Sequence, residues 1–179
     1  MKNLWLSFFL VALLFSSCKK DIFYEEIFVV NENGWGMDSP VMCEFEITDT
    51  LQYYTIYMDI RNTIDFETQN LYVFMDSEDP TGDKNRDTLE FLLADNHGHW
   101  KGHGNGRYRD YQYIFYPKVR FPYKGKYKFV FQQAMREDEI KGIANFGMTI
   151  CYFDEKRFQT MNNIVEKDVF LQSTWILKN

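Results

Sequence analysis

The sequence predicts an all-β fold, an antiparallel β-sandwich of the jelly-roll kind, as a single domain after a lipoprotein signal peptide. Three observations predict it. Short segments alternate apolar and polar residues with period two. Aromatic residues make up 18% of the 179 residues, against 10 glycines and 4 prolines. Turn-prone residues separate the segments, and a chain of this length holds one domain. A barrel is the second candidate for the same pattern.

Residues 1–17 have the features of a signal peptide. Lys2 supplies a positive start, and residues 4–15 are apolar apart from Ser7, a run too short to span a bilayer. The sequence Leu-Phe-Ser-Ser-Cys ending at Cys18 resembles a bacterial lipobox, so we expect cleavage before Cys18 and acylation of its thiol. The alternative is an ordinary signal peptide, or an uncleaved anchor, with an incidental cysteine. Acyl chains would make a stable membrane anchor, at about 0.8 kcal/mol per buried CH₂.

Residues 18–30 are expected to form the lipidated N-terminus and its tether. Lys19, Lys20 and Asp21 loosely resemble a surface-export signal of Bacteroidetes lipoproteins, so a periplasm-facing and an outer-membrane location both remain open. The chain carries 20 Lys and Arg against 26 Asp and Glu, a net charge of −6. This balance argues against nucleic acid as a partner and does not favour anionic lipid, so the anchor would supply the membrane binding.

The predicted sandwich occupies residues 31–153. In its sixth strand, Tyr127, Phe129 and Phe131 alternate with polar residues, as in a sheet with one solvated face. The seven predicted strands are residues 41–47, 53–60, 71–76, 87–93, 111–116, 126–133 and 146–153. Residues 154–179 form a C-terminal extension, for which the sequence suggests a helix around 155–165 and an added edge strand around 170–177.

An ordered series of short motifs runs through this domain. Its members are Asn33-Gly34-Trp35, Arg61-Asn62, Asn70-Leu71, Asp87-Thr88-Leu89, Gly98 with Trp100 and Gly102, Val119-Arg120-Phe121-Pro122, Gln133-Ala134-Met135-Arg136 and Gly142-Ile143. The series resembles the GldH family of gliding-motility lipoproteins of Bacteroidetes, over about residues 18–152. The resemblance implies a membrane-anchored accessory protein of the gliding machinery or a related envelope complex, which contacts other envelope proteins. It implies no biochemical activity.

Most of these motif residues have a structural interpretation. Gly34, Gly98 and Gly125 would adopt the positive φ angles of tight turns. Three arginines near strand ends would either pair with an internal carboxylate such as Asp87 or face a partner. They are Arg61, Arg120 and Arg136.

All three histidines lie within one seven-residue segment, at positions 97, 99 and 103. Imidazoles at this density can bind zinc or copper, but residues 96–104 contain no Cys, Asp or Glu to complete a ligand set. We therefore predict an exposed polar loop without metal or other cofactor. A labile metal site is the alternative.

Residues 107–131 interleave seven basic residues with ten aromatic residues and one acid. Aromatic faces stack on sugar rings and basic groups bind phosphates or carboxylates, so this stretch suggests a surface that binds an envelope glycan or a partner protein. The alternative is amphipathic strands with buried aromatics and solvated lysines. The candidate contact residues are Tyr111, Tyr113, Arg120 and Arg136.

No catalytic motif is present, and the paired carboxylates lie in hydrophilic turns where their pKa values stay ordinary. We therefore predict no enzyme activity and no catalytic residue. Cys43 and Cys151 lie in predicted strands, where a disulfide and two buried thiols are both open. The leading function is that of the envelope lipoprotein, and a surface glycan-binding lipoprotein is the alternative.

Overall fold

The computed structural model describes residues 22–165, with side chains described to residue 160. Cys18, the signal peptide and the predicted strand at 170–177 therefore lie outside the described residues. The elements are β1 (Ile22–Val29), β2 (Trp35–Gly36), β3 (Val41–Ile47), β4 (Tyr54–Thr63), β5 (Asn70–Glu78), β6 (Lys84–Leu92), β7 (Tyr108–Val119), β8 (Gly125–Gln133), β9 (Glu139–Ile140), β10 (Ile143–Tyr152) and α2 (Glu155–Val165).

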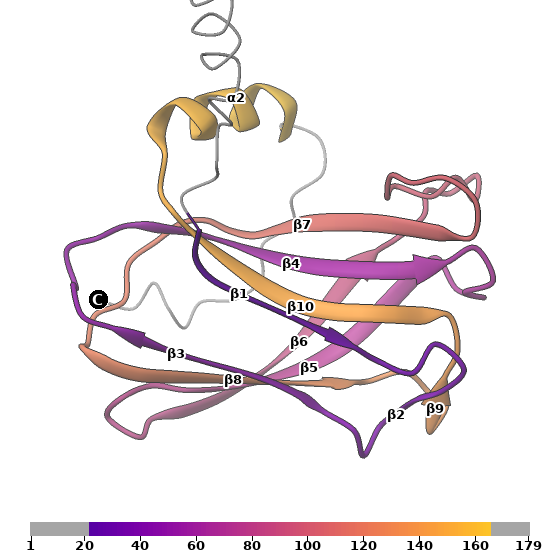
Figure 1. Ribbon diagram of the computed structural model, residues 1–179, viewed down its shortest axis with the longest axis horizontal. Coiled ribbons are helices and arrows are strands. Elements are labelled where there is room, and N and C mark those ends of the chain that lie inside the picture. The colour runs from indigo at the N-terminus through magenta and orange to yellow at the C-terminus, as the bar shows by residue number, and fades with distance from the viewer. Residues whose placement is uncertain (1–21, 166–179) are drawn as a thin grey trace, which may run out of the picture.

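Two four-stranded sheets pack face to face (Figure 1). Their strand orders are β1-β10-β4-β7 and β3-β8-β5-β6, and the short strands β2 and β9 form a separate ladder. Every pair is antiparallel, and the two sheets are not closed into a barrel. The predicted all-β sandwich is therefore confirmed.

One aromatic-rich core fills the space between the sheets. In β3, burial alternates strictly, with every second side chain from Val41 to Ile47 pointing inward. The Phe45 ring stacks on Phe129 with centroids 5.9 Å apart, and Phe146 of the opposite sheet packs 5.3 Å from Trp35. Removing these rings from water on both inner faces drives the sheets together.

The seven predicted strands correspond to β3–β8 and β10, and the predicted helix is α2. Three strands were not expected. β1 occupies eight residues that were predicted to belong to the tether, and it pairs along β10 from Ile22↔Cys151 to Val29↔Asn145. Glu25 and Glu26 interrupt its apolar alternation, which hides the strand in the sequence. β2 and β9 have two residues each, too few to show a period.

The turn glycines behave partly as predicted. Gly98 and Gly125 have positive φ angles, of 81° and 124°. The prediction for Gly34 was wrong, since it does not have a positive φ. A Cβ at Gly34 would lie 2.8 Å from Oε2 of Glu139, the end of an exposed, flexible side chain that can move aside.

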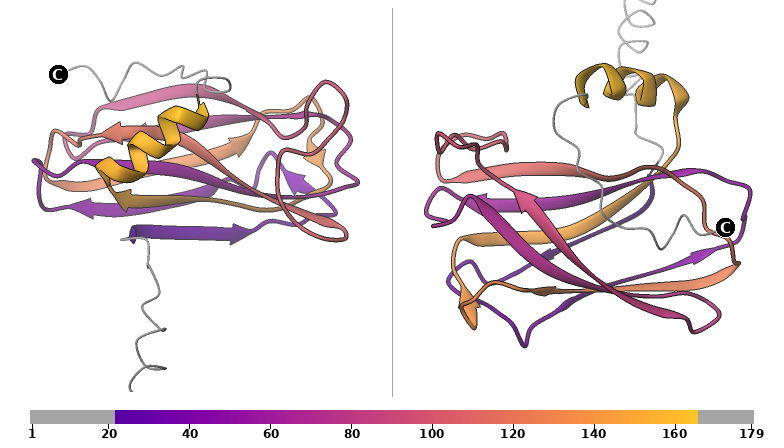
Figure 2. Two further views of the ribbon diagram at one scale, coloured as in Figure 1. Left: turned by 90° about the horizontal axis from the view of Figure 1, so that it is seen from above. Right: turned by 180° about the vertical axis from the view of Figure 1, so that it is seen from behind.

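The sandwich has two ends, each built from its own loops (Figures 1 and 2). The entry end, at the left of Figure 1, contains the start of β1, loops 48–53, 79–83 and 120–124, and the end of β10. The far end contains loops 30–40, 64–69, 93–107 and 134–142. Helix α2 lies outside the first sheet, where the Phe158 ring packs 5.4 Å from Phe153.

Candidate functional site

Loops at the far end are joined by backbone hydrogen bonds. Thr63 N donates to Gly142 O at 2.7 Å, Ile64 N to Arg107 O at 2.8 Å, and Gly142 N to Glu32 O at 2.8 Å. Gly142 has a φ of 89°, and a Cβ there would lie 2.8 Å from Cα of Phe66. Only glycine fits this crossing of loops without strain, so the sequence specifies a fixed loop arrangement.

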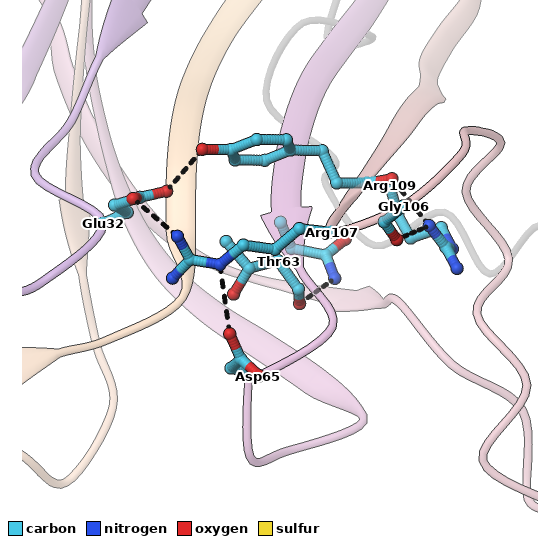
Figure 3. Close-up of polar contacts among 8 residues, drawn as sticks. Glu32, Thr63, Asp65, Gly106, Arg107 and Arg109 are labelled. Carbon is cyan, nitrogen blue, oxygen red and sulfur yellow. Dashed lines mark hydrogen bonds and ion pairs between the residues drawn. The ribbon is translucent and has the colours of Figure 1, made fainter.

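Arg107 binds two acids from different loops at this end (Figure 3). Its Nη1 lies 3.1 Å from Oε1 of Glu32, and its Nε lies 3.1 Å from Oδ2 of Asp65. The hydrogen bond to Asp65, followed by the charge of Glu32, raises the pKa of the guanidinium. The hydroxyl of Tyr108 donates to the other oxygen of Glu32 at 3.1 Å. These contacts link residues 75 and 42 positions apart in the chain.

A second ion pair lies beside the first. Arg61 on β4 donates to both carboxylate oxygens of Asp110 on β7, from Nε to Oδ1 at 2.5 Å and from Nη2 to Oδ2 at 3.1 Å. The guanidinium carbons of Arg61 and Arg107 each lie 6.0 Å from the centre of the Tyr108 ring. The sequence left open whether Arg61 pairs with an internal carboxylate such as Asp87 or faces a partner, and in the structure it pairs with Asp110. Asp87 instead accepts a hydrogen bond from Asn85, and burial raises its pKa.

A groove of about 390 Å³ continues from these residues onto the outer face of the first sheet. It is lined by Ile27, Asp59, Ile60, Arg61, His103, Asp110, Tyr111, Gln112 and Asn145. Asp59 accepts hydrogen bonds from Gln112 at 2.7 Å and from Thr149 at 2.6 Å. Next to the groove, Val29 on the edge strand β1 is 86% exposed. The far end therefore presents ordered ion pairs, amide groups and exposed apolar side chains.

The four predicted contact residues do not form one cluster. Tyr111 and Tyr113 lie together on β7 with ring centroids 6.1 Å apart, and Tyr113 also packs on the buried Phe91. Arg120 follows β7 at the entry end, whereas Arg136 follows β8 at the far end. Glycan binding remains a prediction. Both tyrosine rings are partly buried and pack against the core, which leaves them little free face on which a sugar ring could stack.

The histidine segment forms a turn organised by Asp95. Asp95 Oδ1 accepts hydrogen bonds from the backbone N–H groups of His97 and His99, and its Oδ2 lies 3.1 Å from Nδ1 of His99. These bonds, the backbone N–H of His99 first, lower the pKa of Asp95 to about 2. His103 lies apart and pairs with the backbone of Asp110.

Asp95 was not predicted, because it lies one residue before the segment 96–104, which itself contains no acid. Glu32 and Asp65 were also not predicted, since the sequence offers no signal for them. Among the side chains described, no group of three or more His, Cys, Asp or Glu could hold a metal ion.

Cys43 and Cys151 are both buried thiols, and no disulfide joins them. Burial raises the pKa of the Cys43 thiol to about 12. Of the two alternatives left open by the sequence, the structure has buried thiols.

In the described range, no helix combines the length and apolar composition needed to cross a membrane.

Comparison with known proteins identifies the family. The family model described as GldH lipoprotein matches residues 22–150. A gliding motility lipoprotein GldH homolog of Christiangramia forsetii is 33% identical over 150 residues, which cover 80% of this chain and 91% of that protein. The gliding motility lipoprotein GldH of Flavobacterium johnsoniae is 29% identical over 148 residues, 79% of this chain and 91% of that protein. The match runs from the start of β1 to residue 150 in β10, and the chain belongs to the GldH lipoprotein family.

Proposed function

We propose that this protein is anchored in a cell-envelope membrane through acylated Cys18, and that it acts without catalysis as a component of the gliding machinery or a related envelope complex. One observation carries the proposal. The family match begins at residue 22, four residues after the cysteine of the lipobox, and both relatives are named gliding motility lipoproteins. The anchor and the family domain are therefore directly adjacent in the chain.

The far end supports a role in protein contacts. Arg and Tyr side chains are enriched in protein interfaces, where they combine planar apolar surface with hydrogen-bond donors. Arg61, Arg107 and Tyr108 provide that combination here, held in place by ion pairs. Exposed Val29 and Ile64 lie at the same end and add apolar area. We propose this end as the contact surface for an envelope protein.

The bonding of the acids at this end supports binding over acid–base chemistry. Asp110 and Asp65 are bonded to guanidinium groups, and Asp59 to an amide and a hydroxyl. A general acid needs a carboxyl whose proton is available near neutral pH, which usually requires burial away from cations. These carboxylates are instead arranged to hold cations and loops in position.

Two experiments test the proposal. Cys18→Ser should leave unprocessed precursor and abolish incorporation of radiolabelled palmitate, and equal labelling of the variant would refute the anchor. Cross-linking in cells of the source organism, followed by purification of the intact lipoprotein, should recover a defined envelope protein. Val29→Asp should reduce that recovery, whereas Met42→Asp, an exposed apolar position on the outer face of the other sheet, should not. Recovery of no envelope protein, or equal recovery by both variants, would count against the far end as the contact surface.

A further inference from the structure

We infer that the entry end of the sandwich rests on the phospholipid surface and inserts Leu51 and Tyr123 into the membrane interface. The inference rests on the proposed acylation of Cys18. It adds a second membrane contact, made by folded loops, to the lipid anchor itself.

The short distance from anchor to fold places this end at the membrane. Four Cα–Cα steps separate Cys18 from Ile22, so their maximum separation is about 14 Å. Ile22 pairs with Cys151, which pairs with Thr55 on the next strand. Loop 48–53 precedes Thr55 and therefore extends beyond the start of β1 toward the anchor side. Loop 120–124 extends there too, because Val119 pairs with Tyr54.

The side chains at the tips of these loops suit a lipid interface. Leu51 is 76% exposed, and Tyr123 in the neighbouring loop is 41% exposed. Tyrosine is enriched where membranes meet water, since its ring enters the apolar region while its hydroxyl stays hydrated. Moving the exposed Leu51 side chain from water into the apolar part of the membrane is favourable.

Both loops are held in fixed conformations. Oδ1 of Asp49 accepts the backbone N–H of Leu51 at 2.8 Å. The hydroxyl of Tyr127, a buried residue of β8, accepts from Tyr123 N and donates to Tyr123 O, each at 3.1 Å. The two apolar tips are therefore presented without the entropy cost of ordering a flexible loop.

Basic side chains surround the tips. The Lys118 amine lies 4.9 Å from the centre of the Tyr53 ring, and the Arg120 guanidinium lies 5.8 Å from it. Lys124 is exposed beside Tyr123. Among residues 22–160, neither Arg120 nor Lys124 forms an ion pair, so both can bind lipid phosphates.

Acids limit the contribution of charge at this end. Asp49, Asp83 and Glu155 also lie there, and Glu155 is 3.9 Å from the Lys118 amine. The net attraction to anionic lipid is therefore small. Contact with the membrane therefore depends mainly on Leu51 and Tyr123 and on the short distance from the lipid anchor. The basic side chains add contacts to individual lipid phosphates.

Spin labels on the full, acylated lipoprotein test this orientation. The protein is reconstituted into vesicles of phosphatidylethanolamine and phosphatidylglycerol. A spin label is attached to one introduced cysteine at a time, Leu51→Cys or Tyr123→Cys, since the native Cys43 and Cys151 are buried. Matched controls at the far end are Ile64→Cys and Tyr108→Cys, with exposures of 46% and 39%. Power saturation then compares collisions with oxygen, which concentrates in lipid, and with an aqueous nickel chelate.

Labels at 51 and 123 should show an oxygen-to-nickel ratio several-fold higher than the labels at 64 and 108. Equal, water-like ratios at all four positions, in protein whose mass shows acylated Cys18, would overturn this inference and leave the anchor intact. A mass showing unmodified Cys18 would overturn both the anchor and the orientation.

Discussion

Replacement of Gly147 should detach the strand that joins the anchor to the fold. Gly147 on β10 lies opposite Ile27 on β1, and a Cβ built there would lie 2.6 Å from Cα of Ile27 and still closer to the carbonyl oxygen of Glu26. Carbon atoms pack at about 3.5–4.0 Å, so Gly147→Ala requires β1 to move by about 1 Å. Ladder hydrogen bonds of about 2.9 Å would stretch to about 3.9 Å, beyond bonding range.

The cost follows from the number of bonds affected. Two or three ladder bonds flank the pair, and each contributes about 1 kcal/mol net, so Gly147→Ala should destabilise the protein by about 2–3 kcal/mol. The half-buried rings of Phe23 and Phe28 also lose part of their packing against the core. The change also lengthens the tether between the anchor and the fold. With β1 detached, twelve Cα–Cα steps separate Cys18 from Val30, and the tether could reach about 40 Å.

Urea unfolding and amide hydrogen exchange of residues 22–29 would measure both effects. Gly36→Ala is the matched control, because its Cβ would lie 3.6 Å from Oγ of Ser39, an ordinary contact. We expect the control to change stability by less than about 1 kcal/mol. If Gly147→Ala unfolds at the same urea concentration as the parent, with residues 22–29 still protected, the reasoning about β1 is refuted.

Three further predictions concern the thiols, the far end and the histidines. Burial raises the pKa of Cys43 from 9.0 to about 12, so alkylation of this thiol in the native protein should be roughly a thousandfold slower than that of an exposed thiol. Mass spectrometry measures both rates, and equal rates would contradict the burial of Cys43. The neutral thiol's contribution to stability is present below about pH 9, the unfolded value, and is lost as the pH rises toward 12. Arg107→Ala should slightly lower the urea concentration at the unfolding midpoint, since its ion pairs are solvent-exposed, and Arg107→Lys should recover part of the loss. No change in either variant would show that the ion pairs do not hold the loops. Changing the three histidines to Gln should barely shift the melting temperature, and chelator should not shift that of the parent; a chelator-sensitive transition lost in the variant would establish a metal site. The histidines are His97, His99 and His103.

The sequence alone determined most of the sandwich. Strict period-two alternation such as that of Val41, Cys43 and Phe45 fixes which face of each strand is buried, so β3–β8 and β10 were predictable within a few residues. The family was also predictable, because its ordered motifs are local sequence features. Helix α2 follows from the same local logic.

Only the tertiary structure decided the role of β1 and the composition of the far end. β1 is an edge strand whose outer face is solvated, so its sequence needs no strong alternation of apolar and polar residues. Its position beside β10 depends on the absence of a side chain at Gly147, more than a hundred positions away in the chain. Glu32 and Asp65 meet Arg107 only because three loops converge at one end of the sandwich. Contacts of this kind depend on where the strands end in space. No local sequence pattern indicates which residues, far apart in the chain, will meet there.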